Sequence, residues 1–189
     1  AALCALAAAL DGKSSSTSRS KESVEAGRGA LTPETAARAI ARCLPDDAII
    51  SDEAATSGGA LIPFIANMAP HDVLDLMGGS IVQALPVATG AAVAARDRKT
   101  VCLSGDGGAM YTIQALWTQA RENLDVVTVI YANRAYKILN IEYQRILGQT
   151  PPAQSRTLLD IGRPDLDFVA LAKGMGVEAA MFLHAVFGT

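Results

Sequence analysis

The chain has 189 residues, half of them hydrophobic, and a formal net charge of −3 without any run of basic residues. This length suits one domain with a substantial core. The charge pattern argues against nucleic-acid binding and against a polybasic membrane patch, and the apolar stretch 1–10 is too short to span a membrane. The cysteines Cys4, Cys43 and Cys102 lack CxxC spacing, so we expect reduced, buried thiols in a cytoplasmic protein.

Residues 1–30 are predicted to lie outside the main domain. The apolar stretch 1–10 indicates the end of a helix from a preceding domain, and residues 11–30 are rich in Ser, Gly and charge, as linkers are. The main domain then covers residues 31–189. Its first helix is predicted to begin at Pro33 with Thr32 as the N-cap, because apolar residues follow at helical spacing as far as Leu44.

Strands and helices alternate along the rest of the domain. The expected strands are 48–51, 73–76, 100–103, 126–131 and 177–182, and the expected helices are 85–95, 109–123 and 167–174. Trp117 lies on the apolar face of helix 109–123, so we expect it in the core. The alternation predicts an α/β fold with three α/β/α layers and a mainly parallel sheet.

Polar and glycine residues follow the predicted strand ends. Ligands of open parallel sheets bind beyond the carboxyl ends of the strands, so these segments are the candidate site. They are Glu53–Ser57, Gly78–Ile81, Gly105–Gly108 and Asn133–Ala135.

The segment Gly105-Asp106-Gly107-Gly108 combines a phosphate-binding turn with a carboxylate. Its glycines allow a sharp turn and a close approach of the backbone, and the helix that follows directs free amides at an anion. A carboxylate beside a phosphate would be repelled unless a divalent cation lay between them. Because Mg²⁺ prefers hard oxygen ligands, Asp106 is a candidate magnesium ligand.

Asn133 is the candidate second ligand. It follows strand 126–131, one helix and one strand after Asp106, so the two residues are separated by a single crossover. If the two strands are adjacent, their ends lie about 5 Å apart.

At this point the sequence resembles the thiamine-diphosphate (ThDP) enzymes. Gly105-Asp106-Gly107, followed by Ala132-Asn133, is similar to that family's cofactor motif. The resemblance implies that Asp106, Asn133 and the backbone carbonyl of Ala135 hold Mg²⁺ against the cofactor diphosphate. The sequence departs from the family pattern at Ala132, where a first Asn is usual, and at Gly108, where a Ser often contacts the diphosphate.

Further segments resemble the same family over residues 31–178. By this resemblance, the carbonyl of Gly79 accepts a hydrogen bond from the aminopyrimidine, and Ile81 is the apolar wedge that folds the cofactor. Hydroxyls of Thr56 and Ser57 are expected at the diphosphate. The remaining predicted cofactor-binding residues are Gly105, Gly107, Gly108, Ala109, Tyr136 and Ile138.

The amino-acid sequence of residues 105–124 most resembles the family branch that contains acetolactate synthase and benzoylformate decarboxylase. The resemblance implies a 2-oxo-acid decarboxylase or carboligase, most similar to acetolactate synthase, with a benzoylformate-decarboxylase-like lyase as the alternative. It also implies a homodimer or tetramer, and FAD is possible in the full-length enzyme. The activating glutamate is expected from a pyrimidine-binding domain of the partner subunit, so no catalytic residue is assigned here. The tail 181–189 does not resemble the family's continuation, and we expect truncation at both ends.

Two other functions remain open. A dinucleotide-binding module would use Gly105 and Gly107, with Arg134 at a 2′-phosphate, although Met110 occupies the place of the third glycine. The second alternative is a non-catalytic interaction domain that keeps the fold. Among single residues, Thr56 and Ser57 are alternatively helix caps, Ile81 a core residue, and Glu53 a solvated loop acid.

Overall fold

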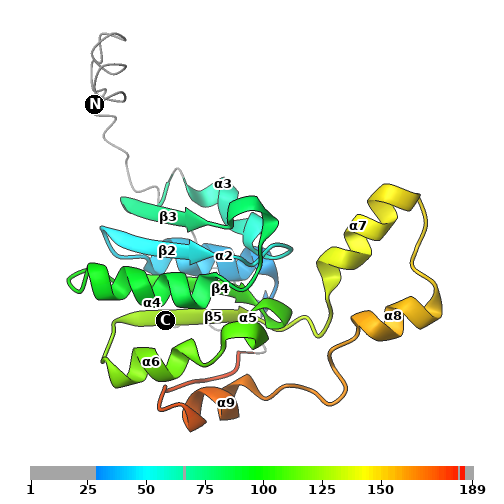
Figure 1. Cartoon of the computed structure of the whole chain (residues 1–189). Coiled ribbons are helices and arrows are strands. Elements are labelled where there is room, and N and C mark those ends of the chain that lie inside the picture. Colours follow the sequence, from blue (N-terminus) through cyan, green and yellow to red (C-terminus); the bar gives the residue numbers. More distant parts are fainter. Residues whose placement is uncertain (1–28, 66, 183, 186–189) are drawn as a thin grey trace, which may run out of the picture.

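The computed structural model describes residues 29–65, 67–182 and 184–185. Its main sheet consists of the parallel strands β2 (Ala48–Asp52), β3 (His71–Asp75), β4 (Thr100–Gly105) and β5 (Val126–Tyr131), in the order β3-β2-β4-β5 (Figure 1). The helices are α2 (Pro33–Cys43), α3 (Ile62–Ile65), α4 (Ala84–Ala94), α5 (Asp106–Thr112), α6 (Ala115–Arg121), α7 (Lys137–Leu147), α8 (Ala153–Leu159) and α9 (Phe168–Gly174), with short 3₁₀ turns η1 (Gly58–Leu61) and η2 (Met77–Gly79).

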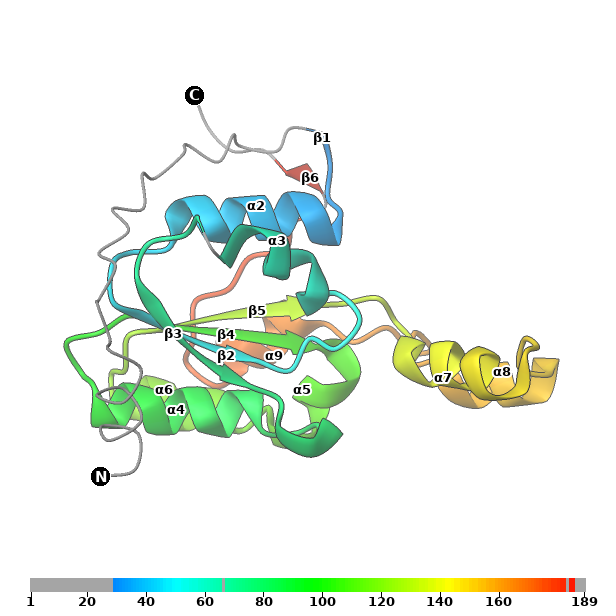
Figure 2. The same cartoon turned by 90° about the horizontal axis from the view of Figure 1, so that it is seen from above.

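The sheet is covered on both faces (Figure 2). Helices α2 and α3 lie on one face, where Ala37, Ile50 and Leu103 belong to one hydrophobic cluster. Helices α4, α5, α6 and α9 cover the other face, where Cys102 and Leu116 belong to a second cluster. Adjacent strand residues point to opposite faces, so one strand such as β4 supplies both clusters. The predicted three-layer α/β/α fold is confirmed.

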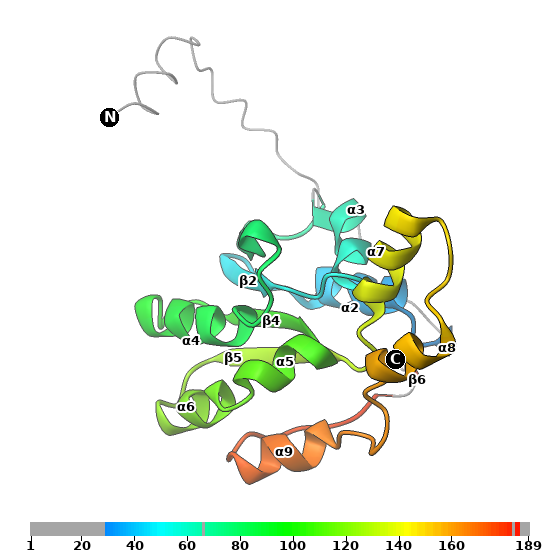
Figure 3. The same ribbon diagram turned by 45° about the vertical axis from the view of Figure 1, so that its right-hand side comes forward.

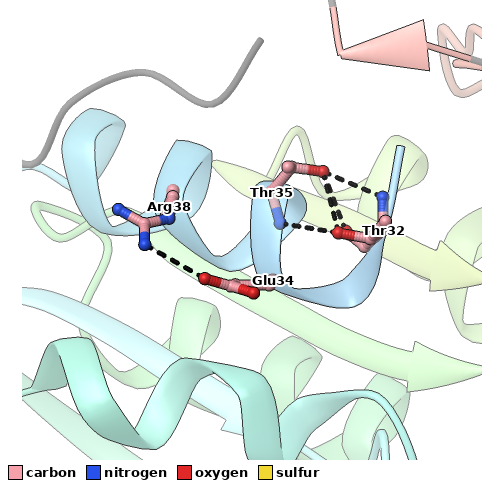
Figure 4. A network of polar contacts seen from close by, with 4 residues as sticks. All are labelled: Thr32, Glu34, Thr35 and Arg38. Atoms are coloured by element: carbon pink, nitrogen blue, oxygen red, sulfur yellow. Dashed lines mark hydrogen bonds and ion pairs between the residues drawn. The ribbon is translucent and has the colours of Figure 1, made fainter. Parts of the chain in front are cut away.

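Helix α2 begins as predicted. Thr32 and Thr35 form a capping box, in which the Thr35 amide donates to Thr32 Oγ1 at 3.2 Å and the Thr32 amide donates to Thr35 Oγ1 at 2.8 Å (Figure 4). Glu34 and Arg38 form an ion pair at 3.0 Å along the exposed side of the first turns. These local bonds satisfy amide groups that the start of a helix leaves free, which explains why the helix start was predictable.

Several predicted elements differ from the structure. Strand β3 begins at His71, earlier than the predicted segment 73–76, and the predicted helix 109–123 consists of α5 and α6 with a break at Ile113–Gln114. Leu116 is buried, whereas Trp117 is 52% exposed. The prediction that Trp117 is a core residue is therefore wrong, and its ring lies instead under the Arg121 guanidinium, 4.9 Å from its centroid.

The C-terminal part of the described chain also departs from expectation. The chain turns at Gly176, which has a φ of 83°, and the Val177 amide donates to the Ala172 carbonyl at 3.0 Å. Residues 177–182 do not form the predicted strand. The short strands β1 (Gly29–Ala30) and β6 (His184–Ala185) pair antiparallel, so the end of the predicted linker is in a strand. The predictions for residues 1–28 and 186–189 lie outside the described residues.

Helices α7 and α8 were not predicted. They contact each other and extend beyond the carboxyl ends of the strands, away from the sheet (Figures 1 and 3). Neither helix has a buried residue, and the apolar side chains of Leu139, Ile146 and Leu158 are exposed. Of the described cysteines, Cys102 is buried as expected and Cys43 is exposed, which corrects the prediction for Cys43. No helix in the described ranges combines the length and apolarity needed to cross a membrane.

Candidate functional site

The two predicted metal-binding segments lie at neighbouring strand ends. Strands β4 and β5 pair directly, with Gly105 opposite Tyr131. The loop after β5 therefore begins beside the turn that starts α5. The expected single crossover between Asp106 and Asn133 is what the sheet contains.

Asp106 connects these two segments. Its side chain is 3% exposed, and its Oδ2 accepts a hydrogen bond from the Arg134 amide at 2.6 Å while Oδ1 accepts from the Gly107 amide at 2.9 Å. Burial raises the pKa of Asp106, and the amides of Arg134 and Gly107 act in the opposite direction. A buried carboxylate of this kind is a strong ligand for a cation, because a neighbouring positive charge offsets the cost of its burial.

Asn133 and Ala135 flank Arg134, whose amide donates to Asp106. Asn133 is exposed, and its Oδ1 accepts from the Ala135 amide at 3.0 Å. The Ala135 carbonyl accepts from the Lys137 amide at 2.7 Å. Each of these oxygens has a second lone pair available. A carboxylate, a side-chain amide oxygen and a backbone carbonyl form the hard-oxygen set that suits Mg²⁺.

Of these three groups, only the Asp106 carboxylate is ionisable; the oxygens of Asn133 and Ala135 are neutral. The described residues contain no group of three or more His, Cys, Asp or Glu side chains that could hold a metal.

The glycines of the turn have different surroundings. A Cβ on Gly107 would lie 2.5 Å from the Tyr136 ring, and a Cβ on Gly108 would lie 2.8 Å from Glu53 Oε1. A Cβ on Gly105 would meet nothing within 4 Å. A side chain at Gly107 or Gly108 would thus clash with protein neighbours, whereas Gly105 borders open space. Ala109 is fully buried in the second cluster.

The segment before α4 has an unusual backbone. Gly78 and Gly79 have φ values of 65° and 68°, and Val82 has a φ of 85°. Gly79 is exposed and Ile81 is half-buried. Gln83 Nε2 is buried without a hydrogen-bond partner among the described residues, and buried donors of this kind are commonly satisfied by a bound group or water.

The remaining predicted residues lie around the same edge of the sheet. Thr56 is exposed and Ser57 is buried in the loop after β2. Ser57 precedes η1 but makes no side-chain capping bond, so the alternative that it caps a helix through its hydroxyl is wrong. Tyr136 precedes α7 and packs on Gly107, and Ile138 is half-buried in the first turn of α7.

Glu53, in the loop after β2, has an environment that the sequence did not indicate. It is 4% exposed, and its Oε1 accepts from Ser104 Oγ at 2.6 Å while Oε2 accepts from the Gln83 and Ala84 amides at 2.8 and 2.9 Å. The interpretation of Glu53 as a solvated loop acid is therefore wrong. The only signal in the sequence was its position directly after a buried strand.

Arg134 does not present a free cation at this edge. Its guanidinium is paired with Asp165, at 2.9 Å from Nε to Oδ1 and 2.7 Å from Nη2 to Oδ2. A 2′-phosphate, as the dinucleotide hypothesis requires, would have to compete with this carboxylate.

Comparisons with known proteins identify the family of this chain. The family model for the C-terminal TPP-binding domain of thiamine pyrophosphate enzymes matches residues 59–186. The chain is 53% identical over 152 residues to the acetolactate synthase-like large subunit IlvX of Mycobacterium tuberculosis, covering 80% of this chain and 30% of IlvX. It is 35% identical over 157 residues to benzoylformate decarboxylase of Pseudomonas aeruginosa, covering 83% of this chain and 28% of that enzyme.

A solved structure gives the same result. The ThDP-dependent 4-hydroxybenzoylformate decarboxylase of Rhodococcus jostii RHA1 superposes with a TM-score of 0.66 at 33% identity, covering 83% of this chain and 28% of that one. The chain thus spans less than a third of the length of these relatives. Since the family model matches most of the chain, the chain belongs to the thiamine pyrophosphate enzymes and contains their C-terminal TPP-binding domain.

Proposed function

We propose that this chain holds the diphosphate and magnesium end of ThDP in a 2-oxo-acid decarboxylase or carboligase. The observation that carries the proposal is the bond from the Arg134 amide to Asp106 Oδ2 at 2.6 Å. It places a buried carboxylate directly against the loop of Asn133 and Ala135. The three proposed Mg²⁺ ligands thus come from two adjacent strand ends.

The other residues would bind and orient the cofactor. Thr56, Ser57 and the turn from Gly105 to Gly108 would contact the diphosphate, and Gly105 borders the open space that such a group needs. Gly79 and Ile81 would contact the aminopyrimidine, while Tyr136 and Ile138 would line the cavity. When bound, ThDP supplies the stabilisation of a carbanion that decarboxylation of a 2-oxo acid requires.

We propose an acetolactate-synthase-like activity over a benzoylformate-decarboxylase-like one, because identity to IlvX is 53% and identity to the decarboxylase is 35%. In this proposal the protein works in the cytoplasm as a homodimer or tetramer. The pyrimidine-binding domain of the partner subunit supplies the activating glutamate, and FAD is an optional further cofactor of the whole enzyme.

Calorimetric titration with ThDP, in the presence and absence of Mg²⁺, tests the proposal. We expect binding that depends on Mg²⁺ and that weakens at least about tenfold in Asp106→Ala and in Asn133→Ala, because each variant removes one ligand oxygen. Asn133→Ala matters most, since Asn133 is exposed and its loss leaves no buried group unpaired. Asp97→Ala, at an exposed position after α4, is the control.

The same titration separates the alternatives. Binding of a dinucleotide without Mg²⁺ would favour the dinucleotide module. A wild-type chain that binds neither ThDP nor inorganic diphosphate with Mg²⁺ would favour a non-catalytic domain that retains the fold.

A further inference from the structure

The buried Glu53 side chain links three elements that surround the proposed site. Its carboxylate accepts from Ser104 Oγ on β4 at 2.6 Å and from the two amides that begin α4, those of Gln83 and Ala84, at 2.8 and 2.9 Å. Ser104 is fully buried. Hydrogen bonds between buried groups are stronger than the same bonds in water, so these bonds join β4, α4 and the loop after β2.

The residue before Gln83 has a strained backbone. Val82 has a φ of 85°, a region that β-branched residues rarely adopt. Such an outlier persists only where surrounding contacts hold it, and outliers cluster at functional sites. The chain from Gly79 and Ile81 passes directly through this residue into α4.

One peptide unit beside Val82 is held at both ends. The Val82 carbonyl accepts from Thr112 Oγ1 at 3.2 Å, and the amide of the same peptide, on Gln83, donates to Glu53 Oε2 at 2.8 Å. Thr112 is the last residue of α5, the helix that begins with Asp106. Glu53 and Thr112 therefore form hydrogen bonds with opposite sides of the Val82–Gln83 peptide. We name Glu53, Val82, Gln83 and Thr112 the Val82 clamp.

We propose that Glu53 and Thr112 are positioning residues of the cofactor site. By holding the Val82–Gln83 peptide, they set the place of Ile81 and Gly79 relative to the Gly105–Gly108 turn. The clamp connects the Gly79–Ile81 segment to the Gly105–Gly108 turn. Thr112 and Asp106 lie on the same helix, α5, and Glu53 Oε1 lies against Gly108. The role in cofactor binding rests on the proposed function, whereas the clamp itself does not.

The clamp is tested first on the protein without ligand. Hydrogen exchange of the Gln83 amide is compared in the wild type, Thr112→Val and Thr112→Ser, because valine removes only the hydroxyl and serine restores it. We expect exchange about tenfold faster in Thr112→Val, wild-type behaviour in Thr112→Ser, and unchanged β2 and β4 amides. Thr118→Val, which removes a threonine hydroxyl on α6, is the matched control. Unchanged Gln83 exchange in Thr112→Val would overturn the clamp.

The positioning role is tested by comparing two ligands in the presence of Mg²⁺. If the clamp sets Ile81 and Gly79, Thr112→Val weakens ThDP binding about tenfold and leaves binding of inorganic diphosphate unchanged, because only ThDP has the aminopyrimidine. Thr112→Ser should restore ThDP binding. A parallel loss for both ligands, or no loss for either, would overturn the positioning role.

The two tests also separate this inference from the proposed function. If the wild-type chain binds neither ThDP nor inorganic diphosphate with Mg²⁺, the proposed function fails and the positioning role fails with it. The exchange of the Gln83 amide still decides whether the clamp exists.

Discussion

The acidic residues at the carboxyl ends of the strands differ in burial and in hydrogen bonding. Asp106 and Glu53 are buried and accept hydrogen bonds from backbone amides. Asp52, at the end of β2, is half-buried and accepts from the Ala54 amide at 2.7 Å. Burial raises the pKa of Asp52, and the charges of Asp75 and Glu53 raise it further against the effect of the Ala54 bond.

The raised pKa of Asp52 predicts a specific pH dependence. The folded chain retains a proton on Asp52 at pH values where the unfolded chain, with a pKa of 3.8, has lost it. The contribution of this group to stability therefore falls as the pH rises from 3.8 through the raised pKa. Asn at this position keeps the acceptor for Ala54, so Asp52→Asn should be more stable than the wild type at pH 7. The advantage should shrink towards pH 4.

Thermal unfolding between pH 4 and pH 8 checks this expectation. Asp97→Asn, at an exposed position, is the control and should follow the wild-type profile. If Asp52→Asn shows the same dependence on pH as the wild type, Asp52 has no such effect on folding.

At the scale of elements, the site depends on how α5 meets the segment before α7. The first turn of α5 packs against the Tyr136 ring, and this contact is possible because Gly107 has no side chain. Gly107→Ala would place a Cβ 2.5 Å from Tyr136. Because such overpacking costs about 1–3 kcal/mol, it should exceed the gain of up to about 1 kcal/mol that Ala offers over Gly within a helix.

Urea unfolding measures the effect, as a lower transition midpoint for Gly107→Ala. Gly59→Ala is the matched control, because a Cβ on Gly59 would meet nothing within 4 Å. Its free energy of unfolding should stay within about 0.5 kcal/mol of the wild type. Equal midpoints for the two variants would show that the Tyr136 contact does not constrain α5.

At the scale of the whole molecule, the chain spans less than a third of its relatives. The activating glutamate is proposed to come from another domain of the partner subunit. We therefore expect the purified chain to bind ThDP weakly and to release no carbon dioxide from pyruvate or benzoylformate. Carbon dioxide release above the rate of free ThDP, lost in Asp106→Ala, would contradict this expectation.

Much of the architecture was accessible from sequence because its signals are local. Val126–Tyr131 is uninterrupted and β-branched, and Thr32 with Pro33 satisfies the start of its own helix. The four-stranded order and the position of α7 and α8 were not accessible in this way. Helices α7 and α8 have no buried residue, and apolar side chains such as Leu139 and Ile146 are exposed.

The parallel α/β fold and the family could be read from the chain alone, because strand–helix alternation and the Gly105-Asp106-Gly107 motif with Asn133 are patterns along the sequence. The burial of Glu53 against α4, the exposure of Trp117 and the absence of a strand at 177–182 became known from the folded chain. All three have one cause. Burial and strand pairing depend on which distant segments become neighbours, and a hydrogen bond such as that from the Gln83 amide to Glu53 joins residues that no local pattern connects.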